Sequence, residues 1–319
     1  MKLIAKNCIS LIIPIVVTAN IFAQPVIKNG QLKVVGTQLT NQYNQPVALA
    51  GISFGWSCFH PRFYTAGTVK WLATKWNCNV VRASMGIEPD KGYLADSATS
   101  MQLITTVVDA AIKQHIYVIV DWHSHNIQLN KAIAFFKTMA QKYHQYPNII
   151  YEVFNEPDYE TWPEVKAYSI EIIKAIREVD KNNIILVGSP KWDQDVHLPA
   201  NDPIVGYNNL MYTMHFYAGT HKQRLRDRTD EAIAKGLPIF VSECAGMDAT
   251  GDGKIDDTEW GKFIVWMHQK KLSWVTWSLS DKDESCSMLL PSASSNGKWK
   301  EKDIKESGKK TKLFLQAIQ

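Results

Sequence analysis

Short apolar runs alternate with longer amphipathic stretches along residues 25–319. The short runs are rich in β-branched and aromatic residues, as strands buried on both faces are, whereas the longer stretches carry apolar residues at helical spacing. Strands are predicted at 48–54, 80–85, 117–122, 149–154, 184–187, 210–215, 238–243 and 274–278. Helices are predicted at 67–76, 101–114, 132–144, 162–179, 223–235, 257–271 and 303–318.

The alternation predicts an α/β fold, a (β/α)8 TIM barrel with a short N-terminal β-hairpin. Eight strands with their crossovers fill about 270 residues, which is the usual size of this closed parallel barrel. The runs 32–37 and 45–49 bracket the polar residues 41–44 and predict the hairpin. An open doubly wound sheet is the alternative. It would show a glycine-rich first turn, and the Ser-Phe-Gly-Trp sequence at 53–56 is not one.

Composition and charge narrow the class of protein. The chain has 319 residues, 45% of them hydrophobic, so wholesale disorder, fibrous repeats and small disulfide scaffolds are excluded. The net charge is only +4 and no basic stripe is present, which predicts no nucleic-acid partner. No repeat or Pro/Gly-rich linker divides residues 24–319, so we expect them to form a single domain.

Residues 1–23 have the parts of a secretory signal peptide: Lys2 and Lys6, an apolar core at 9–17, and Ala23 before the expected cleavage point. The apolar core is too short to span a bilayer and no second one follows. We therefore predict a secreted or periplasmic protein without a membrane span. Export permits disulfides. Two states stay open for four cysteines, paired or buried as free thiols: Cys58, Cys78, Cys244 and Cys286.

Polar residues gather at the predicted strand ends, which in a barrel surround the active site. Glu156 and Glu243 each follow an apolar strand, where an unpaired carboxylate is costly to bury. One such glutamate could simply pair with a cation and fix a loop. Two on different strands favour a catalytic pair that divides the roles of acid and nucleophile, as glycosidic bond cleavage requires. Neighbouring strand ends carry Arg82, His123, His215 and Tyr217.

Five segments then follow one another in a specific order. They are Asp-Trp-His at 121–123, Asn-Glu-Pro at 155–157, His-Phe-Tyr-Ala-Gly-Thr-His at 215–221, Ser-Glu at 242–243 and Trp-Ser-Leu-Ser-Asp-Lys at 277–282. Together they resemble glycoside hydrolase family 5, and within it the bacterial endoglucanases (cellulases). The resemblance implies a secreted, retaining endo-β-1,4-glucanase with one catalytic barrel domain at 24–319, acting on internal bonds of cellulose and related β-glucans.

The resemblance also implies roles for individual residues. Glu156 would be the general acid/base, Glu243 the nucleophile, and Asn155 would bind the 2-hydroxyl of the reacting sugar. Arg82 and Tyr217 would hold Glu243 ionised by lowering its pKa. The other implied substrate-binding residues are His123, His215 and Trp277 in the reacting subsite, Lys282 and Glu284 at the next sugars, and Trp192 near the leaving group.

Two features depart from the family pattern. Cys244 follows the nucleophile where these enzymes usually carry Trp, and the smaller side chain would lose stacking area beside the site. The loop at 54–60 matches the family poorly, which leaves Trp56 as the candidate aromatic for the outer sugar subsite.

Residues 248–259 have the spacing of a twelve-residue calcium loop, with Gly253 at the tight turn. The alternative is a turn-rich acidic loop followed by a capped helix start. The calcium interpretation predicts a structural ion, with no cofactor needed for catalysis. Its side-chain ligands would be Asp248, Thr250, Asp252, Asp256 and Glu259.

The expected partner is a β-glucan polysaccharide or oligosaccharide, and the protein is expected to be a monomer. Mannan, xyloglucan or mixed-linkage glucan stay possible substrates, because loops select the polysaccharide. A non-catalytic carbohydrate-binding barrel is a second alternative, although both glutamates are present. A third is a metal-dependent hydrolase built on His123 and His125, which would need further ligands on later strands.

Overall fold

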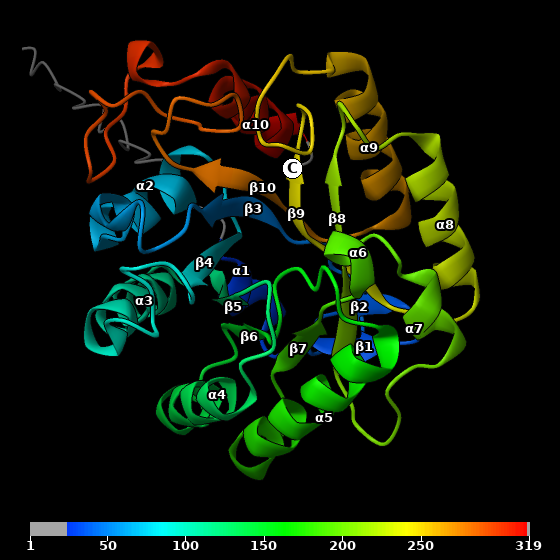
Figure 1. Cartoon of the computed structure of the whole chain (residues 1–319). Helices are drawn as coiled ribbons and strands as arrows, with labels where there is room; N and C mark the ends of the chain where they lie inside the picture. Colours follow the sequence, from blue (N-terminus) through cyan, green and yellow to red (C-terminus); the bar gives the residue numbers. More distant parts are fainter. Residues whose placement is uncertain (1–23, 318–319) are drawn as a thin grey trace, which may run out of the picture.

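Eight parallel strands close into a barrel in the computed structural model, which describes residues 24–317 (Figure 1). Around the barrel the order is β10-β3-β4-β5-β6-β7-β8-β9. The bounds are β3 Ala50–Phe54, β4 Val80–Gly86, β5 Tyr117–His123, β6 Ile149–Glu152, β7 Ile184–Val187, β8 Leu210–Tyr217, β9 Ile239–Ala245 and β10 Trp274–Leu279. The predicted barrel is confirmed and the open sheet is wrong. The predicted signal peptide at 1–23 lies outside the described residues.

Helices surround the barrel and join its strands (Figure 1). Those predicted are all present, with ends shifted by a few residues: α2 Ala66–Lys75, α3 Ser97–Gln114, α4 Leu129–Tyr143, α5 Trp162–Val179, α8 Gln223–Ala234, α9 Asp257–Lys270 and α10 Glu306–Ala317. α3 begins early because the Asp96 carboxylate caps it, accepting from Thr99 N at 3.0 Å. The irregular connection between β7 and β8 holds two short helices, α6 Pro190–Asp193 and α7 His197–Asn201.

The N-terminal hairpin is present, but the predicted pairing of its second strand was wrong. β1 Lys33–Val35 pairs with β2 Gln38–Thr40 and not with residues 45–49. Gly36 allows the tight turn because its φ of 59° lies in the left-handed region that glycine adopts without strain. Residues 41–44 form a second turn, after which a single bridge joins Thr40 to Pro46. A short unpredicted helix, α1 Pro25–Asn29, precedes the hairpin.

The lower layer of the barrel interior, at the start of the strands, is apolar. Residues two apart on a strand point to the same side, so each strand contributes alternate side chains. Residues of α1, the hairpin and its flanks close this layer at its end. Its members are Val26, Leu32, Leu39, Leu49, Val80, Tyr117, Ile119, Ile150, Ile184, Leu186, Met211, Phe240 and Val275.

The upper layer of the barrel interior begins two residues further along the same strands and is polar. The successive inward residues are Val80 then Arg82, Ile119 then Asp121, and Ile150 then Glu152. The three charged side chains are fully buried. The alternation that packs the core therefore also brings charged groups together at the carboxyl end of the barrel.

β9 contains one more residue than either neighbour between paired positions. Thr213 and His215 on β8 pair with Phe240 and Glu243, and Trp274 and Thr276 on β10 pair with Val241 and Cys244. Such a β-bulge changes which residues face the interior. Ser242 and Glu243 consequently both contact interior residues, whereas Val241 and Cys244 pack in the core between barrel and helices.

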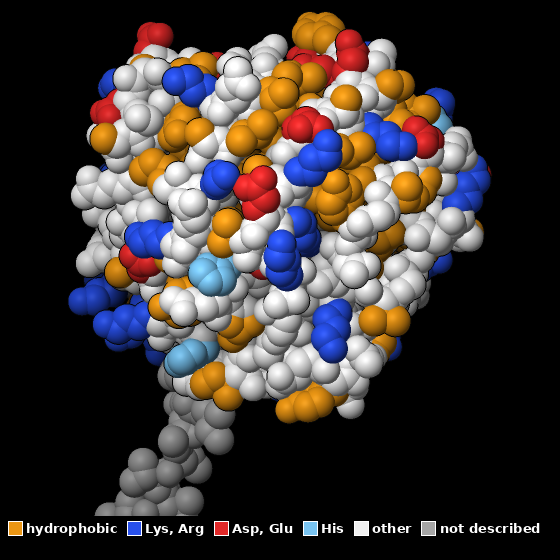
Figure 2. All heavy atoms as spheres, turned by 90° about the horizontal axis from the view of Figure 1, so that it is seen from below, with side chains coloured by type: hydrophobic (Ala, Val, Ile, Leu, Met, Phe, Trp, Pro, Cys, Tyr) orange, Lys and Arg blue, Asp and Glu red, His pale blue; other side chains and the backbone are white. Residues whose placement is uncertain are grey.

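The surface carries charges of both signs. On the face in Figure 2, lysine and arginine side chains lie among acidic and apolar ones. Within residues 24–317 no helix has both the length and the apolar character needed to cross a bilayer.

Candidate active site

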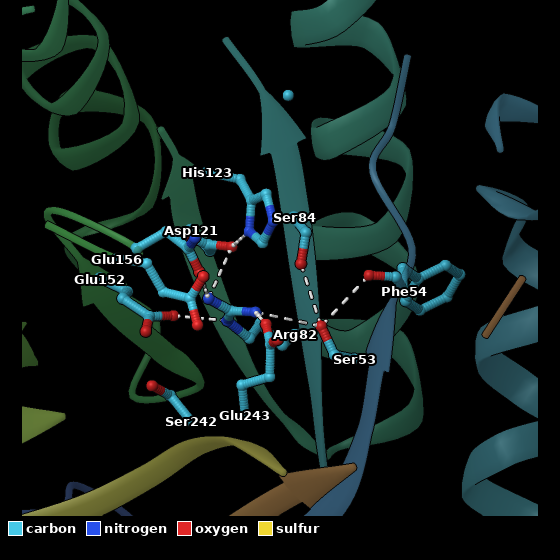
Figure 3. A network of polar contacts seen from close by, with 12 residues as sticks. Ser53, Phe54, Arg82, Ser84, Asp121, His123, Glu152, Glu156, Ser242 and Glu243 are labelled. Carbon is cyan, nitrogen blue, oxygen red and sulfur yellow. Dashed lines mark hydrogen bonds and ion pairs between the residues drawn. The ribbon is translucent and has the colours of Figure 1, made fainter. Parts of the chain in front are cut away.

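Arg82 organises the upper layer. Its guanidinium lies 2.6 Å from Glu152 Oε2, 3.0 Å from Asp121 Oδ2 and 3.0 Å from Glu243 Oε2 (Figure 3). Its Nη2 also donates to Asn155 Oδ1 at 2.6 Å. Because the planar guanidinium presents its donors in a fixed fork, one side chain from β4 sets the positions of groups from β5, β6 and β9.

Glu243 has the two partners that the family resemblance implied. Arg82 Nη1 lies 3.0 Å from Oε2, and the Tyr217 hydroxyl donates to Oε1 at 2.6 Å. Burial nevertheless raises the pKa of Glu243, the Glu156 charge raises it further, and His215, Arg82 and Tyr217 only partly offset this. The expected contacts are present and both lower the pKa of Glu243, as the resemblance implied, although burial and the Glu156 charge outweigh them in the free protein.

Glu156 shares a short contact with His215. His215 Nδ1 lies 2.9 Å from Glu156 Oε1, and Nε2 lies 2.9 Å from Ser242 Oγ. Burial raises the pKa of Glu156, but the hydrogen bond and charge of His215 outweigh it and lower that pKa. One oxygen each of Glu156 and Glu243 and one ring nitrogen of His215 lie within 4.8 Å of one another. The two glutamates therefore face one small space.

A cavity of about 630 Å³ extends from Glu156 and His215 along Tyr217 to Trp192. Trp192 is 42% exposed and lines this cavity, on the side where the resemblance put the leaving group. Elsewhere in the site Trp277 stacks on His123, with ring centroids 5.0 Å apart and an interplanar angle of 2°. Trp56 meets the His123 ring edge-on at 4.3 Å. Aromatic rings thus occur in two parts of the site.

Lys282 and Glu284 are not brought to the glutamate pair. Lys282 Nζ lies 2.5 Å from Glu284 Oε2, and Glu284 lines a separate cavity with Asp252 and Ser285. Within the described chain, no hydrogen bond or ion pair joins either residue to Glu156 or Glu243. Their assignment to neighbouring sugars stays a prediction.

Three of the five predicted calcium ligands have partners outside the loop. Asp256 caps α9 and binds Lys222 Nζ at 2.6 Å, and Glu259 binds Arg226 at 3.0 Å. Asp252 accepts from Ser285 N and Oγ at 3.0 and 2.8 Å. Among residues 24–317, neither the loop with Asp248 and Thr250 nor the pair His123 and His125 forms a group of three ligating side chains. The Asp256 cap fits the capped-loop alternative, and the calcium interpretation stays a prediction.

Cys244 does not border the site, so the expected loss of stacking area beside Glu243 is wrong. Its side chain packs in the core between barrel and helices, and Sγ donates to Val275 O at 3.3 Å. The reason is the β9 bulge, which places Glu243 inward and Cys244 outward. The four cysteines within residues 24–317 are buried free thiols: Cys58, Cys78, Cys244 and Cys286.

Several buried residues of the site had been given no role from the sequence. They are Asp121, Glu152, Asp193 and Ser242. Glu152 carried a readable signal, since a charge inside an apolar strand must find a partner. Asp121 holds His123 Nδ1 at 2.7 Å. Asp193 gave no signal, because its position depends on an irregular turn.

A sequence profile described as cellulase (glycosyl hydrolase family 5) matches residues 40–283. The chain belongs to glycosyl hydrolase family 5. An endoglucanase of Clostridium saccharobutylicum is 41% identical over 286 residues, which are 88% of this chain and 63% of that protein. Endoglucanase Z of Dickeya dadantii is 40% identical over 276 residues, 85% of this chain and 63% of that protein. The chain thus spans about three fifths of the length of these relatives.

Two similar solved structures have the same barrel. One from Cytophaga hutchinsonii is 42% identical with a TM-score of 0.90, and the match covers 92% of this chain and 96% of that one. The catalytic domain of Thermobifida fusca endoglucanase Cel5A, solved with cellotetraose, is 31% identical with a TM-score of 0.87. That match covers 92% of this chain and 99% of that one.

Proposed function

We propose that the protein is an endo-β-1,4-glucanase that cleaves cellulose and related β-glucans with retention of anomeric configuration. The observation that carries this is the separation of at most 4.8 Å between one oxygen of Glu156 and one of Glu243. Retaining glycosidases hold their carboxyl groups about 5–5.5 Å apart, whereas inverting ones leave about 6.5–9.5 Å for a water. The short separation supports direct attack by one of the two glutamates.

In the proposed reaction Glu243 attacks the anomeric carbon while Glu156 gives its proton to the leaving oxygen. A covalent glycosyl-enzyme forms, and Glu156 then removes a proton from the water that hydrolyses it. Asn155 supports sugar binding, since Arg82 occupies its Oδ1 and its buried Nδ2 has no partner within the described chain. That amide can donate to the 2-hydroxyl, where hydrogen bonds strengthen in the transition state.

The proton for the first step lies between Glu156 and His215, which are 2.9 Å apart. Burial lowers the pKa of His215, but Asp193, Glu152, Glu156 and Glu243 together raise it well above its ordinary value. A protonated imidazole beside an ionised Glu156 holds the same proton as a neutral imidazole beside glutamic acid. The His215–Glu156 pair can therefore supply the proton that the leaving group takes up, and this step needs no cofactor.

The relatives support the proposed substrate. Two are named endoglucanases, and a third was solved with cellotetraose, which supports a β-1,4-glucan. We propose a monomer that is secreted or periplasmic after cleavage of residues 1–23. Mannan, xyloglucan and mixed-linkage glucan are the competing substrates.

Two measurements test this function. Reducing-sugar release is measured on soluble cellulose, mixed-linkage glucan, mannan, xylan and xyloglucan, with cellulose expected to give the highest rate. NMR of the first product from a soluble cello-oligosaccharide should show the β anomer. Initial release of the α anomer would contradict retention, and an inactive wild type would favour a binding protein.

The two glutamates are told apart with an activated aryl cellobioside and azide. Glu156→Ala should still release the aryl group in a burst, and azide should speed its second step to give a β-glycosyl azide, since azide needs no base. Glu243→Ala should lose activity on both the polysaccharide and the aryl cellobioside. In this variant azide could act only in place of the missing carboxylate, which would give the α-glycosyl azide. Swapped product anomers would reverse the two roles.

A further inference from the structure

A strained turn connects the acid/base to the wall of the cavity. Lys191, Trp192 and Asp193 are consecutive and have φ values of 59°, 55° and 59°. Residues with side chains rarely adopt this left-handed conformation, so three in a row must be held by contacts outside the turn. The turn also touches the catalytic loop, since Trp192 N donates to Pro157 O at 3.0 Å.

Asp193 provides the inner contact of this turn. Its side chain is fully buried, and one oxygen accepts from Ser189 N at 2.5 Å, which closes the turn on itself. The other oxygen, Oδ2, lies 3.3 Å from His215 Nε2 and has no hydrogen-bond partner within residues 24–317. A buried carboxylate oxygen aimed at an imidazole is costly unless the two charges stabilise each other.

We infer that Asp193 is a positioning residue for the acid/base: it orients the His215 ring against Glu156 and anchors the turn that carries Trp192. This inference rests on the proposed function. Through one carboxylate, the side chain that lines the leaving-group cavity and the group that protonates the leaving oxygen are fixed to each other.

The surroundings of the His215 ring favour a hydrogen on Nε2. Nε2 faces two carboxylate oxygens, Asp193 Oδ2 at 3.3 Å and Glu152 Oε1 at 3.8 Å, as well as Ser242 Oγ at 2.9 Å. Acceptors on this side keep a hydrogen on Nε2. Nδ1 then faces Glu156 alone, and the second proton of the pair lies on the line between Nδ1 and Glu156 Oε1.

The charged groups that face His215 come from several elements of the barrel. Four acidic residues surround it: Asp193 lies on α6, Glu152 on β6, Glu156 in the loop after β6 and Glu243 on β9. Arg82 on β4 is the other cation of the layer, and Tyr217 on β8 binds Glu243. His123 on β5 is not a second one, because burial and the Arg82 charge lower its pKa well below the ordinary value. Burial raises the pKa of Asp193 well above its ordinary value and His215 opposes this, so each charge favours the other. Removing the Asp193 charge should make the His215–Glu156 pair release its proton at lower pH.

The test compares wild type with Asp193→Asn, which keeps the shape and removes the charge. We expect the alkaline limb of kcat/KM on soluble cellulose to move down by about one pH unit or more. We also expect kcat on cellulose to fall about 10-fold or more, part of the roughly 10²–10⁴-fold that a positioned acid contributes. The burst on an aryl cellobioside with a good leaving group should change little, because that step needs no acid.

Asp180→Asn is the matched control, since Asp180 is also a buried aspartate but contacts Tyr151 and Asn183. It should lower the melting temperature without moving the alkaline limb. If Asp193→Asn fails to fold, Asp193→Ser, which keeps a side-chain oxygen for the turn, carries the test. An unmoved limb, or equal losses on cellulose and on the aryl cellobioside, would overturn the inference. A wild type that cleaves no β-glucan would instead refute the proposed function.

Discussion

The lower and upper layers of the barrel interior stand on the same strands but have opposite chemistry. In the lower layer apolar side chains such as Ile150 and Phe240 fill the space with no exposed surface. One step of two residues further, Glu152 and Ser242 belong to a network centred on Arg82 and His215. A strand spaces such residues about 6.6 Å apart, so the change from apolar core to buried charge is abrupt.

This difference indicates which layer stabilises the fold. In the upper layer five carboxyl groups face two principal cations, Arg82 and His215, and such an excess of buried charge costs stability. The carboxyl groups are Asp121, Glu152, Glu156, Asp193 and Glu243. We therefore expect upper-layer variants to change activity and lower-layer variants to change stability.

The largest expected effect is on activity, from Glu243→Gln. Loss of the proposed nucleophile should lower kcat/KM on soluble cellulose by about 10⁴-fold or more. The free energy of unfolding in urea should stay constant or rise, because the amide removes a surplus buried charge. Glu301→Gln, at a 71% exposed side chain, is the control and should change neither. A large loss of stability in Glu243→Gln would contradict the division between layers.

Arg82→Met should affect both properties. It leaves Asp121 and Glu152 without their cation, which we expect to cost about 3–5 kcal/mol. Burial already raises the pKa of Asp121 well above its ordinary value, and Arg82 opposes this. Without Arg82 the folded state holds that proton more tightly than the unfolded state, so stability should be lost as pH rises through the folded pKa. Urea unfolding at pH 5 and pH 8 checks this, and an equal loss at both would refute it.

Phe240→Ala tests the lower layer on the strand that also carries Glu243. Truncating this fully buried ring should cost about 3–5 kcal/mol of unfolding free energy. Well below the melting temperature, kcat on cellulose should stay within about twofold, since the cavity lies in the other layer. Val265→Ala, at a 56% exposed position, is the matched control. A fall in kcat with unchanged stability would mean that Phe240 acts on the catalytic residues of the upper layer, and would contradict the division between layers.

Cys244→Trp should have a smaller effect on stability, because it adds volume to the core, whereas Phe240→Ala removes it. Because Cys244 faces the helices, the large ring should overpack that core and cost about 1–3 kcal/mol. The KM for cello-oligosaccharides should not change. Cys244→Ala controls for loss of the thiol. A lower KM without loss of stability would mean that this side chain reaches the substrate.

The smallest expected effect is that of a calcium chelator. Asp256 and Glu259 already bind Lys222 and Arg226, so the melting temperature should be the same with and without chelator. An ion that binds only the folded state would raise the melting temperature by mass action. A chelator-induced fall that Asp252→Ala abolishes would restore the calcium prediction.

The barrel and the glutamate pair were predictable because both depend on the order of apolar runs along the chain. Eight apolar runs with crossovers allow few topologies, and the strand ends of a barrel meet at one place. The hairpin pairing was missed because the turn at Gly36 competes with the more obvious polar turn at 41–44. The partners of Asp256 and Glu259 lie on or next to α8, about 30 residues earlier, and no local pattern reveals such contacts. Asp193 depends on backbone angles that the sequence does not show.

The extra residue in β9 also divides that strand into two halves of opposite phase. Counted in twos from Phe240, the interior positions would be Ser242 and Cys244, with the Glu243 carboxylate among the helices. Deleting one residue between Phe240 and Glu243 would put Glu243 two positions after Phe240, so a strand without the bulge would then hold this carboxylate inside the barrel. The reading frame of the strand, and not only its composition, therefore decides whether the barrel presents a carboxylate or a thiol to a bound sugar.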